Sequence, residues 1–160
     1  MANDREFHTV RGYQLLEQQT RMLSPAMEDY LEMICRHSGE DGYLRIHSLA
    51  ELLNVKASSA SKMVQRLGKL GMLKYERYGL VRLTETGKTV GEYLLARHAA
   101  IEDFLKFLSG GQDVLTQTEL IEHNIDAATA ENMRKMCQFF MGNRKIAEKF
   151  REYLESQEEE

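Results

Sequence analysis

The chain has 160 residues, of which 42% are hydrophobic and 29% are charged, and its formal net charge at pH 7 is −4. This length and apolar fraction suit one domain or two small domains with a real core, which argues against disorder along the whole chain. The apolar runs are much shorter than the roughly 20 residues that span a membrane, and the N-terminus lacks the apolar core of a signal peptide. We therefore expect a soluble, cytoplasmic protein with no membrane partner.

The net charge is an average over unlike segments. Residues 43–82 contain eight basic and two acidic residues, a local net charge of +6, so the remainder of the chain sums to −10. Such asymmetry is typical of a polyanion-binding module joined to an acidic one. A solvated basic surface with no partner gives the same pattern, and charge alone does not decide between the two.

The first elements in chain order are a polar arm and a helix. Residues 1–23 are polar with scattered apolar positions, and we expect a partly helical arm. Ser24-Pro25 predicts a helix start, with serine as N-cap and proline at the first helical position. The helix should end near Gly39, and its apolar stripe consists of Met27, Tyr30, Leu31 and Ile34.

The next elements predict a winged helix-turn-helix. A short helix at 46–53 and a third helix at about 57–69 are separated by a tight turn at Asn54 and Val55. Residues 72–83 then alternate apolar and polar side chains around a glycine, which predicts a β-hairpin. In a winged helix-turn-helix the third helix lies in the major groove of DNA and the hairpin touches the adjacent backbone.

The candidate DNA contacts lie on the polar face of the third helix and at the hairpin. Gln65 could read a base edge, whereas the basic side chains suit phosphates. The serines could equally cap the helix, and each position could be an ordinary exposed polar residue. The full candidate set is Ser58, Ser59, Ser61, Lys62, Gln65, Arg66, Lys69 and Arg77.

Helices are expected to fill the second half. Thr84 or Thr86 should cap a long helix that reaches about Leu108, and Gly110-Gly111 breaks it. Further helices are predicted at about 113–125, 128–141 and 144–156. We therefore predict a mainly α protein with an arm at 1–23, a winged helix-turn-helix domain at 24–90 and an all-helical domain at 91–160.

Carboxylates and histidines occur at helical spacing in both halves. Two acids three residues apart point the same way on the first predicted helix, and a Glu-x-x-Glu-His run shares one face of helix 113–125. A solvated acidic turn and a buried core histidine would explain them separately. Together, four carboxylates and two imidazoles suit a divalent metal that prefers oxygen, such as Mn²⁺. These residues are Asp29, Glu32, His98, Glu119, Glu122 and His123.

The two cysteines do not suggest a metal site. Cys35 and Cys137 are too few for a disulfide framework and are not spaced like a zinc ribbon. We expect both to be reduced thiols in packed positions.

Several separated motifs resemble one family. They are SPAMEDYLE at 24–32, SSASKMVQRL at 58–67, YERYGLVRLT at 75–84, Arg97-His98 and Ile121-Glu122-His123. In one collinear order over about residues 23–145, these motifs resemble the diphtheria-toxin-repressor-like metalloregulators, specifically their manganese-responsive branch.

The resemblance implies a homodimeric transcriptional repressor of double-stranded operator DNA, with no enzymatic activity and no small organic substrate. The domain at 91–160 would bind metal and form the dimer, and the operator would be a palindrome near manganese-uptake genes. The six carboxylates and histidines named above would be the ligands of Mn²⁺, as a pair of ions in each protomer, with Fe²⁺, Cd²⁺ or Zn²⁺ as possible substitutes. In the iron-responsive branch, methionine and cysteine typically take the places of Asp29 and Glu119.

Three other functions remain open on the sequence alone. One is an iron-responsive repressor of the same family, and another is a winged-helix regulator that senses an organic ligand. The third is a carboxylate-bridged dimetal enzyme, because Glu119-x-x-Glu122-His123 is similar to the Glu-x-x-His motif of ferritin-like bundles. That enzyme needs two such motifs, however, and the chain contains one.

Overall fold

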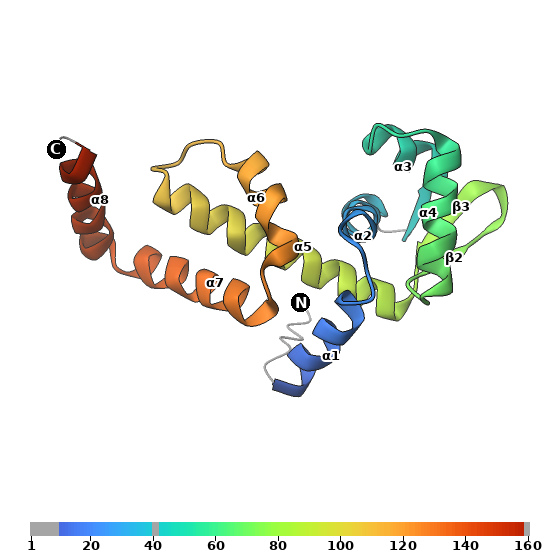
Figure 1. The fold of residues 1–160 in the computed structure, drawn as a ribbon, viewed down its shortest axis with the longest axis horizontal. Helices are drawn as coiled ribbons and strands as arrows, with labels where there is room; N and C mark the ends of the chain where they lie inside the picture. Colours follow the sequence, from blue (N-terminus) through green and yellow to red (C-terminus); the bar gives the residue numbers. More distant parts are fainter. Residues whose placement is uncertain (1–9, 40–41, 159–160) are drawn as a thin grey trace. The chain divides into compact units, whose positions relative to one another are not determined.

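The computed structural model describes residues 10–39 and 42–158 (Figure 1). The chain divides into two compact units, the first ending at Ala96 and the second beginning at Arg97. We refer to them as unit 1 and unit 2 and describe each by itself. Within the described residues, no helix is long and apolar enough to cross a membrane.

Unit 1 consists of helices around a small sheet. Its helices are α1 (Val10–Thr20), α2 (Pro25–His37), α3 (Ile46–Leu52), α4 (Ala57–Lys69) and the first part of α5 (Glu85–Leu108). The strands β1 (Tyr43–Arg45), β2 (Leu73–Tyr75) and β3 (Leu80–Leu83) form an antiparallel sheet in the order β1-β3-β2. The winged helix-turn-helix architecture is therefore confirmed.

Helix α2 begins where the sequence predicts. The Ser24 hydroxyl accepts a hydrogen bond from the backbone N–H of Met27 at 3.3 Å, and Pro25 occupies the first helical position. Tyr30, Leu31 and Ile34 of the predicted stripe are buried in the core of unit 1. The helix ends at His37, two residues before Gly39.

Helices α3 and α4 form the helix-turn-helix. Asn54 in the turn between them has a φ of 51°, in the left-handed region that asparagine tolerates well. Ala60, Val64 and Leu67 of α4 are buried, so the opposite side of the helix faces solvent.

The predicted hairpin is present, with a 3-10 turn at Arg77–Gly79 between β2 and β3. Strand β1, which pairs with β3, was not predicted. It has only three residues, too few for an alternating pattern to be recognised.

Two glycines allow α5 to pack closely within unit 1. A Cβ atom on Gly87 would lie 1.9 Å from the carbonyl oxygen of Met72, and one on Gly91 would lie 2.8 Å from Cβ of Cys35 on α2. Of the two expected caps, Thr84 accepts a hydrogen bond from the N–H of Gly87 at 2.9 Å. Helix α5 is therefore held against both α2 and the start of the wing.

Unit 2 contains the rest of α5, then α6 (Leu115–Ile121), a 3-10 turn at Glu122–Asn124, α7 (Ala127–Gly142) and α8 (Arg144–Glu158). Stacked rings join three of the helices. Phe107 of α5 lies 4.6 Å from Phe140 of α7 and 5.5 Å from Phe150 of α8, measured between ring centroids.

The expectation of a single helix over 113–125 was wrong. Helix α6 ends at Ile121, and Ile125 is extended because Asp126 begins the next helix as its N-cap. The hydroxyl of Thr118 also bonds to the carbonyl of Val114 at 3.0 Å, a local bond that competes with regular helix. Glu122 and His123 therefore lie in a 3-10 turn, and not on one α-helical face with Glu119.

Candidate metal centre and nucleic-acid interface

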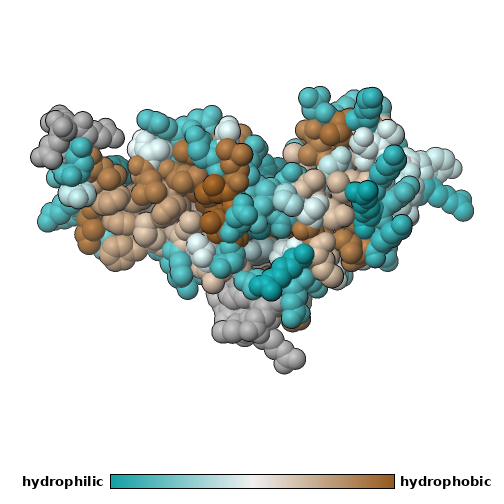
Figure 2. Space-filling view, viewed as in Figure 1, coloured by the Kyte–Doolittle hydropathy of each residue, from teal (hydrophilic) through white to brown (hydrophobic). Residues whose placement is uncertain are grey.

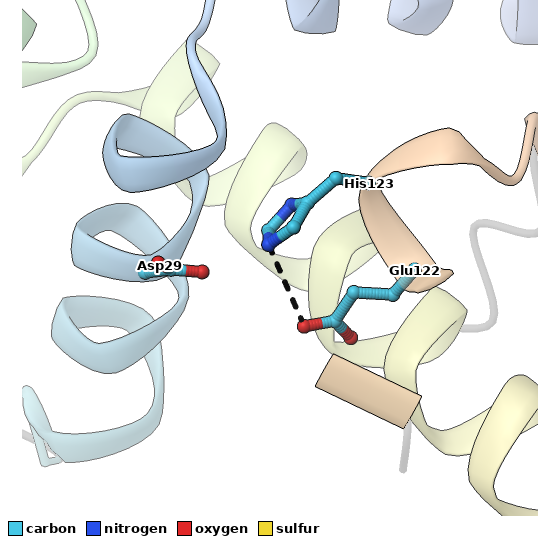
Figure 3. Close-up of side chains that lie close together, drawn as sticks. All are labelled: Asp29, Glu122 and His123. Atoms are coloured by element: carbon cyan, nitrogen blue, oxygen red, sulfur yellow. Dashed lines mark ion pairs between the residues drawn. The ribbon is translucent and has the colours of Figure 1, made fainter. Parts of the chain in front are cut away.

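A buried carboxylate between two histidines is the central feature of unit 2. Nδ1 of His98 and Oε2 of Glu122 lie 2.7 Å apart, at hydrogen-bond distance. The other carboxylate oxygen of Glu122 lies 4.0 Å from Nε2 of His123, and Figure 3 shows this second pair. The fold thus brings together three potential metal ligands, one from α5 and two from the 3-10 turn.

Burial makes this cluster chemically unusual. Glu122 is 3% exposed and His98 is 8% exposed. Burying an ionised carboxylate is costly unless a positive charge or hydrogen-bond donors compensate it. Both oxygens of Glu122 face imidazole nitrogens, which can be cationic or can bind a metal ion beside the carboxylate. The residues present therefore fit a divalent cation.

The remaining sequence-predicted ligands belong to other helices. Asp29 and Glu32 are three residues apart on α2 in unit 1, and Asp29 is exposed. Figure 3 shows the side chain of Asp29 on this helix. Glu32 is largely buried and forms an ion pair with Arg36 at 2.7 Å. Glu119 is exposed on α6. The structure therefore joins His98, Glu122 and His123 within unit 2, and it carries Asp29 and Glu32 side by side on one helix of unit 1.

The thiols are poorly suited to metal binding. Burial raises the pKa of Cys35, and the nearby charges of Glu92 and Glu32 raise it further. Burial likewise raises the pKa of Cys137. Because the thiolate is the form that binds metals, oxygen and nitrogen are the available donors.

The candidate DNA-reading helix is α4. Lys62, Arg66 and Lys69 are exposed, and none of them forms an ion pair with a carboxylate in the described residues. The other predicted contacts are also at the surface: Ser58, Ser59, Gln65 and Arg77 are exposed, and Ser61 is half-buried.

The serines do not cap α4. Its N-cap is Lys56, and no side chain makes the capping hydrogen bond. Ser58 and Ser59 lie in the first turn of α4, at the positive end of the helix dipole, where phosphate oxygens are favoured.

The two units differ in surface character (Figure 2). Hydrophilic residues predominate along α4, whereas hydrophobic residues extend over the helices of unit 2. The large exposed apolar residues of unit 2 are Leu108, Leu115, Leu120, Met136, Phe139, Met141, Ile146 and Tyr153. Exposed apolar surface of this kind is typical of a protein–protein interface.

Comparison with known families decides the class of protein. Residues 22–81 match the model of the iron dependent repressor N-terminal DNA-binding domain. Residues 84–151 match the iron dependent repressor metal-binding and dimerisation domain. The chain belongs to the iron-dependent repressor family. It is therefore a metal-dependent transcriptional repressor that uses a divalent metal, binds DNA and pairs with a second copy of itself.

Individual relatives of this repressor are also named as transcriptional regulators. It is 40% identical over 133 residues to the HTH-type transcriptional regulator MntR of Shouchella clausii (strain KSM-K16), covering 82% of this chain and 92% of the relative. It is 38% identical to the regulator of the same name from Bacillus pumilus (strain SAFR-032), over 74% of this chain and 83% of the relative. These relatives are regulators, so the dimetal-enzyme alternative is excluded.

Solved structures also resemble this repressor. The manganese regulator SloR matches with a TM-score of 0.62 and 25% identity, over 73% of this chain and 55% of that one. The T. acidophilum IdeR structure matches with a TM-score of 0.60 and 26% identity, over 68% of this chain and 52% of that one. The repressor thus spans about half the length of these two proteins.

Proposed function

We propose that the chain is a manganese-responsive repressor, in which Mn²⁺ bound by ligands from both units orders a homodimer for a palindromic operator of manganese-uptake genes. The observation that carries this proposal is the buried Glu122 carboxylate between His98 and His123. The proposal includes a cytoplasmic location, a pair of ions per protomer, the arm at 1–23 and domains at 24–90 and 91–160.

The chemistry of the ligands favours manganese. The proposed set contains four carboxylates and two imidazoles, and burial keeps both thiols protonated. Hard oxygen donors suit Mn²⁺, whereas thiolates would select Zn²⁺ or Cu⁺. The relatives named MntR and the manganese regulator SloR support the same choice. The six proposed ligands are Asp29, Glu32, His98, Glu119, Glu122 and His123.

Helix α5 gives a physical reason for sharing ligands between the units. It begins in unit 1, where Gly91 contacts Cys35 of α2, and it continues into unit 2. His98 follows Gly91 by about two turns and so returns to nearly the same helix face. Glu32 lies one turn before Cys35 on α2. This spacing favours a site to which α2, α5 and the 3-10 turn all contribute.

The carboxylates would make the repressor responsive. Asp29 and Glu32 would repel Glu119 and Glu122 if the two groups approached, and a bound ion supplies the positive charge that offsets this repulsion. The ligand residues would then favour one orientation of the two units. In a dimer, that orientation sets the separation of the two α4 helices, which must match half-sites about 34 Å or a multiple apart.

The response would be a coupling between the metal site and the DNA-binding site, because no ligand residue needs to touch DNA. Couplings of this kind typically change affinity by about 5- to 150-fold. The proposal therefore predicts a large but finite effect of Mn²⁺, with weak DNA binding in its absence.

A titration of labelled promoter DNA from a manganese-uptake gene tests the proposal. Fluorescence anisotropy would be followed with Mn²⁺, Fe²⁺, Zn²⁺ and EDTA in parallel. The proposal predicts that Mn²⁺ raises the affinity at least about 10-fold over EDTA. A stronger response to Fe²⁺ than to Mn²⁺ would favour the iron-responsive alternative, and binding that ignores both metals and chelator would contradict the proposal.

A further inference from the structure

Glu32, one of the proposed ligands, has a cationic partner on its own helix. Nη2 of Arg36 donates a hydrogen bond to Oε1 of Glu32 at 2.7 Å, and the two residues are four positions apart on α2. This spacing places both side chains on one face of the helix, with the acid nearer the N-terminus, which is the favoured order. The ion pair is therefore local to α2 and needs no contact with unit 2.

Burial of the acid distinguishes this pair from an ordinary surface ion pair. The side chain of Glu32 is 14% exposed, whereas that of Arg36 is 46% exposed. A carboxylate that loses most of its water needs compensation by a cation or by hydrogen-bond donors, and the guanidinium supplies both. Arg36 keeps much of its contact with solvent, so it depends less on the pair than Glu32 does.

A second Glu–Arg pair in unit 1 provides a contrast. Glu17 and Arg21 have the same residue types at the same spacing, but their charged atoms lie 3.9 Å apart. Their side chains are 33% and 80% exposed, and Glu17 is not among the proposed ligands. Exposed pairs of this kind contribute little. Arg21 is therefore a matched control for Arg36.

A guanidinium and a metal ion compete for the same carboxylate. Both need close contact with its oxygens, and both are positively charged, so the carboxylate holds the two together only against their mutual repulsion. On binding a metal, Glu32 must either release Arg36 or keep both cations close to each other. In either case, Arg36 lowers the affinity of Glu32 for the metal.

We propose that Arg36 is a built-in counterion of Glu32, which stabilises the metal-free state and raises the Mn²⁺ concentration at which the repressor responds. Arg36 does not bind the metal. It is a positioning residue that acts through Glu32, so the proposal rests on the role of Glu32 as a ligand in the proposed function. Without Arg36, the repressor should bind its promoter at a lower Mn²⁺ concentration.

Isothermal titration calorimetry with Mn²⁺ tests the proposal. Arg36→Gln should bind Mn²⁺ about 5-fold more tightly than wild type, the scale expected for the loss of a half-exposed ion pair. Because damage to the fold would weaken binding, a gain in affinity is specific to the competition. Arg36→Lys keeps a cation at the same spacing and should bind as wild type does, and so should the control Arg21→Gln. An affinity of Arg36→Gln equal to or below that of wild type would overturn the proposal.

Melting temperatures give a readout without metal. In EDTA, Arg36→Gln should melt below wild type, because the largely buried Glu32 loses a cationic partner. Saturating Mn²⁺ should raise the melting temperature of this variant more than that of wild type, since tighter binding to the folded state stabilises it more. Equal melting temperatures in EDTA would contradict the stabilisation of the metal-free state.

A double-mutant cycle with Glu32 separates this proposal from the proposed function. Glu32→Gln should weaken Mn²⁺ binding, and adding Arg36→Gln should then have no further effect, because the pair is already broken. If Glu32→Gln weakens binding but Arg36→Gln alone does not strengthen it, only the role of Arg36 is wrong. If Glu32→Gln binds Mn²⁺ as wild type does, Glu32 is not a ligand, and both proposals fail at this residue.

Discussion

The charged groups of unit 1 and unit 2 differ in their partners. Lys62, Arg66 and Lys69 on α4 are exposed and have no carboxylate partner in the described part of the chain. In unit 2, Glu122 is almost fully buried and lies against His98. Exposed, uncompensated cations suit a large polyanion that arrives and leaves. A buried carboxylate requires a partner held at a fixed geometry.

This difference predicts two kinds of dependence on solution conditions. At physiological salt, interactions of exposed charges are largely screened beyond about 8–10 Å. DNA binding by the exposed cations should therefore weaken steeply as salt is added. The buried pair is screened much less. Salt and metal should therefore act on separate parts of the molecule.

The largest expected effect comes from the buried carboxylate. Glu122→Gln keeps the size of the side chain but removes the negative charge between His98 and His123. We expect Mn²⁺ affinity to fall at least about 100-fold, measured by isothermal titration calorimetry. Glu155→Gln, at an exposed position on α8, is the matched control and should bind Mn²⁺ as wild type does. Equal affinities would remove Glu122 from the metal site.

The packing of α5 within unit 1 should be sensitive to a single methyl group. Gly87→Ala would place Cβ 1.9 Å from the carbonyl oxygen of Met72, so the backbone must shift. We expect the free energy of unfolding to fall by about 3 kcal/mol in urea titrations. Gly142→Ala in unit 2 meets no atom within 4 Å and should be neutral or slightly stabilising. Similar effects at both glycines would contradict the close packing.

The N-cap of α7 makes a pH-dependent contribution to the stability of unit 2. The backbone N–H of Thr129 donates to Asp126 at 2.7 Å, and this bond lowers the pKa of the carboxyl. The stabilisation by Asp126 is fully present above the pKa that its carboxyl has in the unfolded chain, about 3.9. This stabilisation is lost as the pH falls through the lower pKa of the carboxyl in the folded state.

Asp126→Ala should therefore cost about 1 kcal/mol of unfolding free energy at neutral pH. The difference from wild type should shrink as the pH falls below the folded pKa. Urea unfolding at several pH values measures both quantities, and a difference independent of pH would show that the charge of Asp126 is not involved.

The smallest expected effect is at the tip of the wing. Tyr78 is 89% exposed and has a φ of 62°, a left-handed conformation that costs a tyrosine more than an asparagine. Tyr78→Asn should therefore raise the free energy of unfolding by about 0.5 kcal/mol. Asn54 already has the favourable residue for its φ of 51°, so Asn54→Tyr should change stability in the opposite direction.

Local signals predicted much of the fold. The Ser24-Pro25 start of α2 follows from capping chemistry, and the bounds of α4 follow from helical spacing, both of which depend on neighbouring residues. Strand β1 was not predicted because its three residues acquire their structure by pairing with β3, almost 40 positions later. The helix break at Glu122 was missed because no proline or glycine marks it.

The types of the candidate site residues could be predicted, but their geometry could not. Helical spacing singled out His98 and Glu122 as potential ligands. Their separation of 2.7 Å joins residues 24 positions apart, and the burial of Glu122 depends on packing within unit 2. The pairing of Tyr43 with Arg82 likewise depends on the sheet register, which is a tertiary property. The metal-binding assignment itself remains a prediction.

A shared metal site is tested most directly by comparing promoter binding by wild type, Asp29→Ala and Glu122→Gln, each with Mn²⁺ and with EDTA. The two variants remove one proposed ligand from each unit. We expect Mn²⁺ to raise the affinity of wild type for the promoter at least about 10-fold, while both variants bind equally weakly with Mn²⁺ or EDTA. If either variant kept the full response to Mn²⁺, the claim that one metal site joins the two units would be wrong.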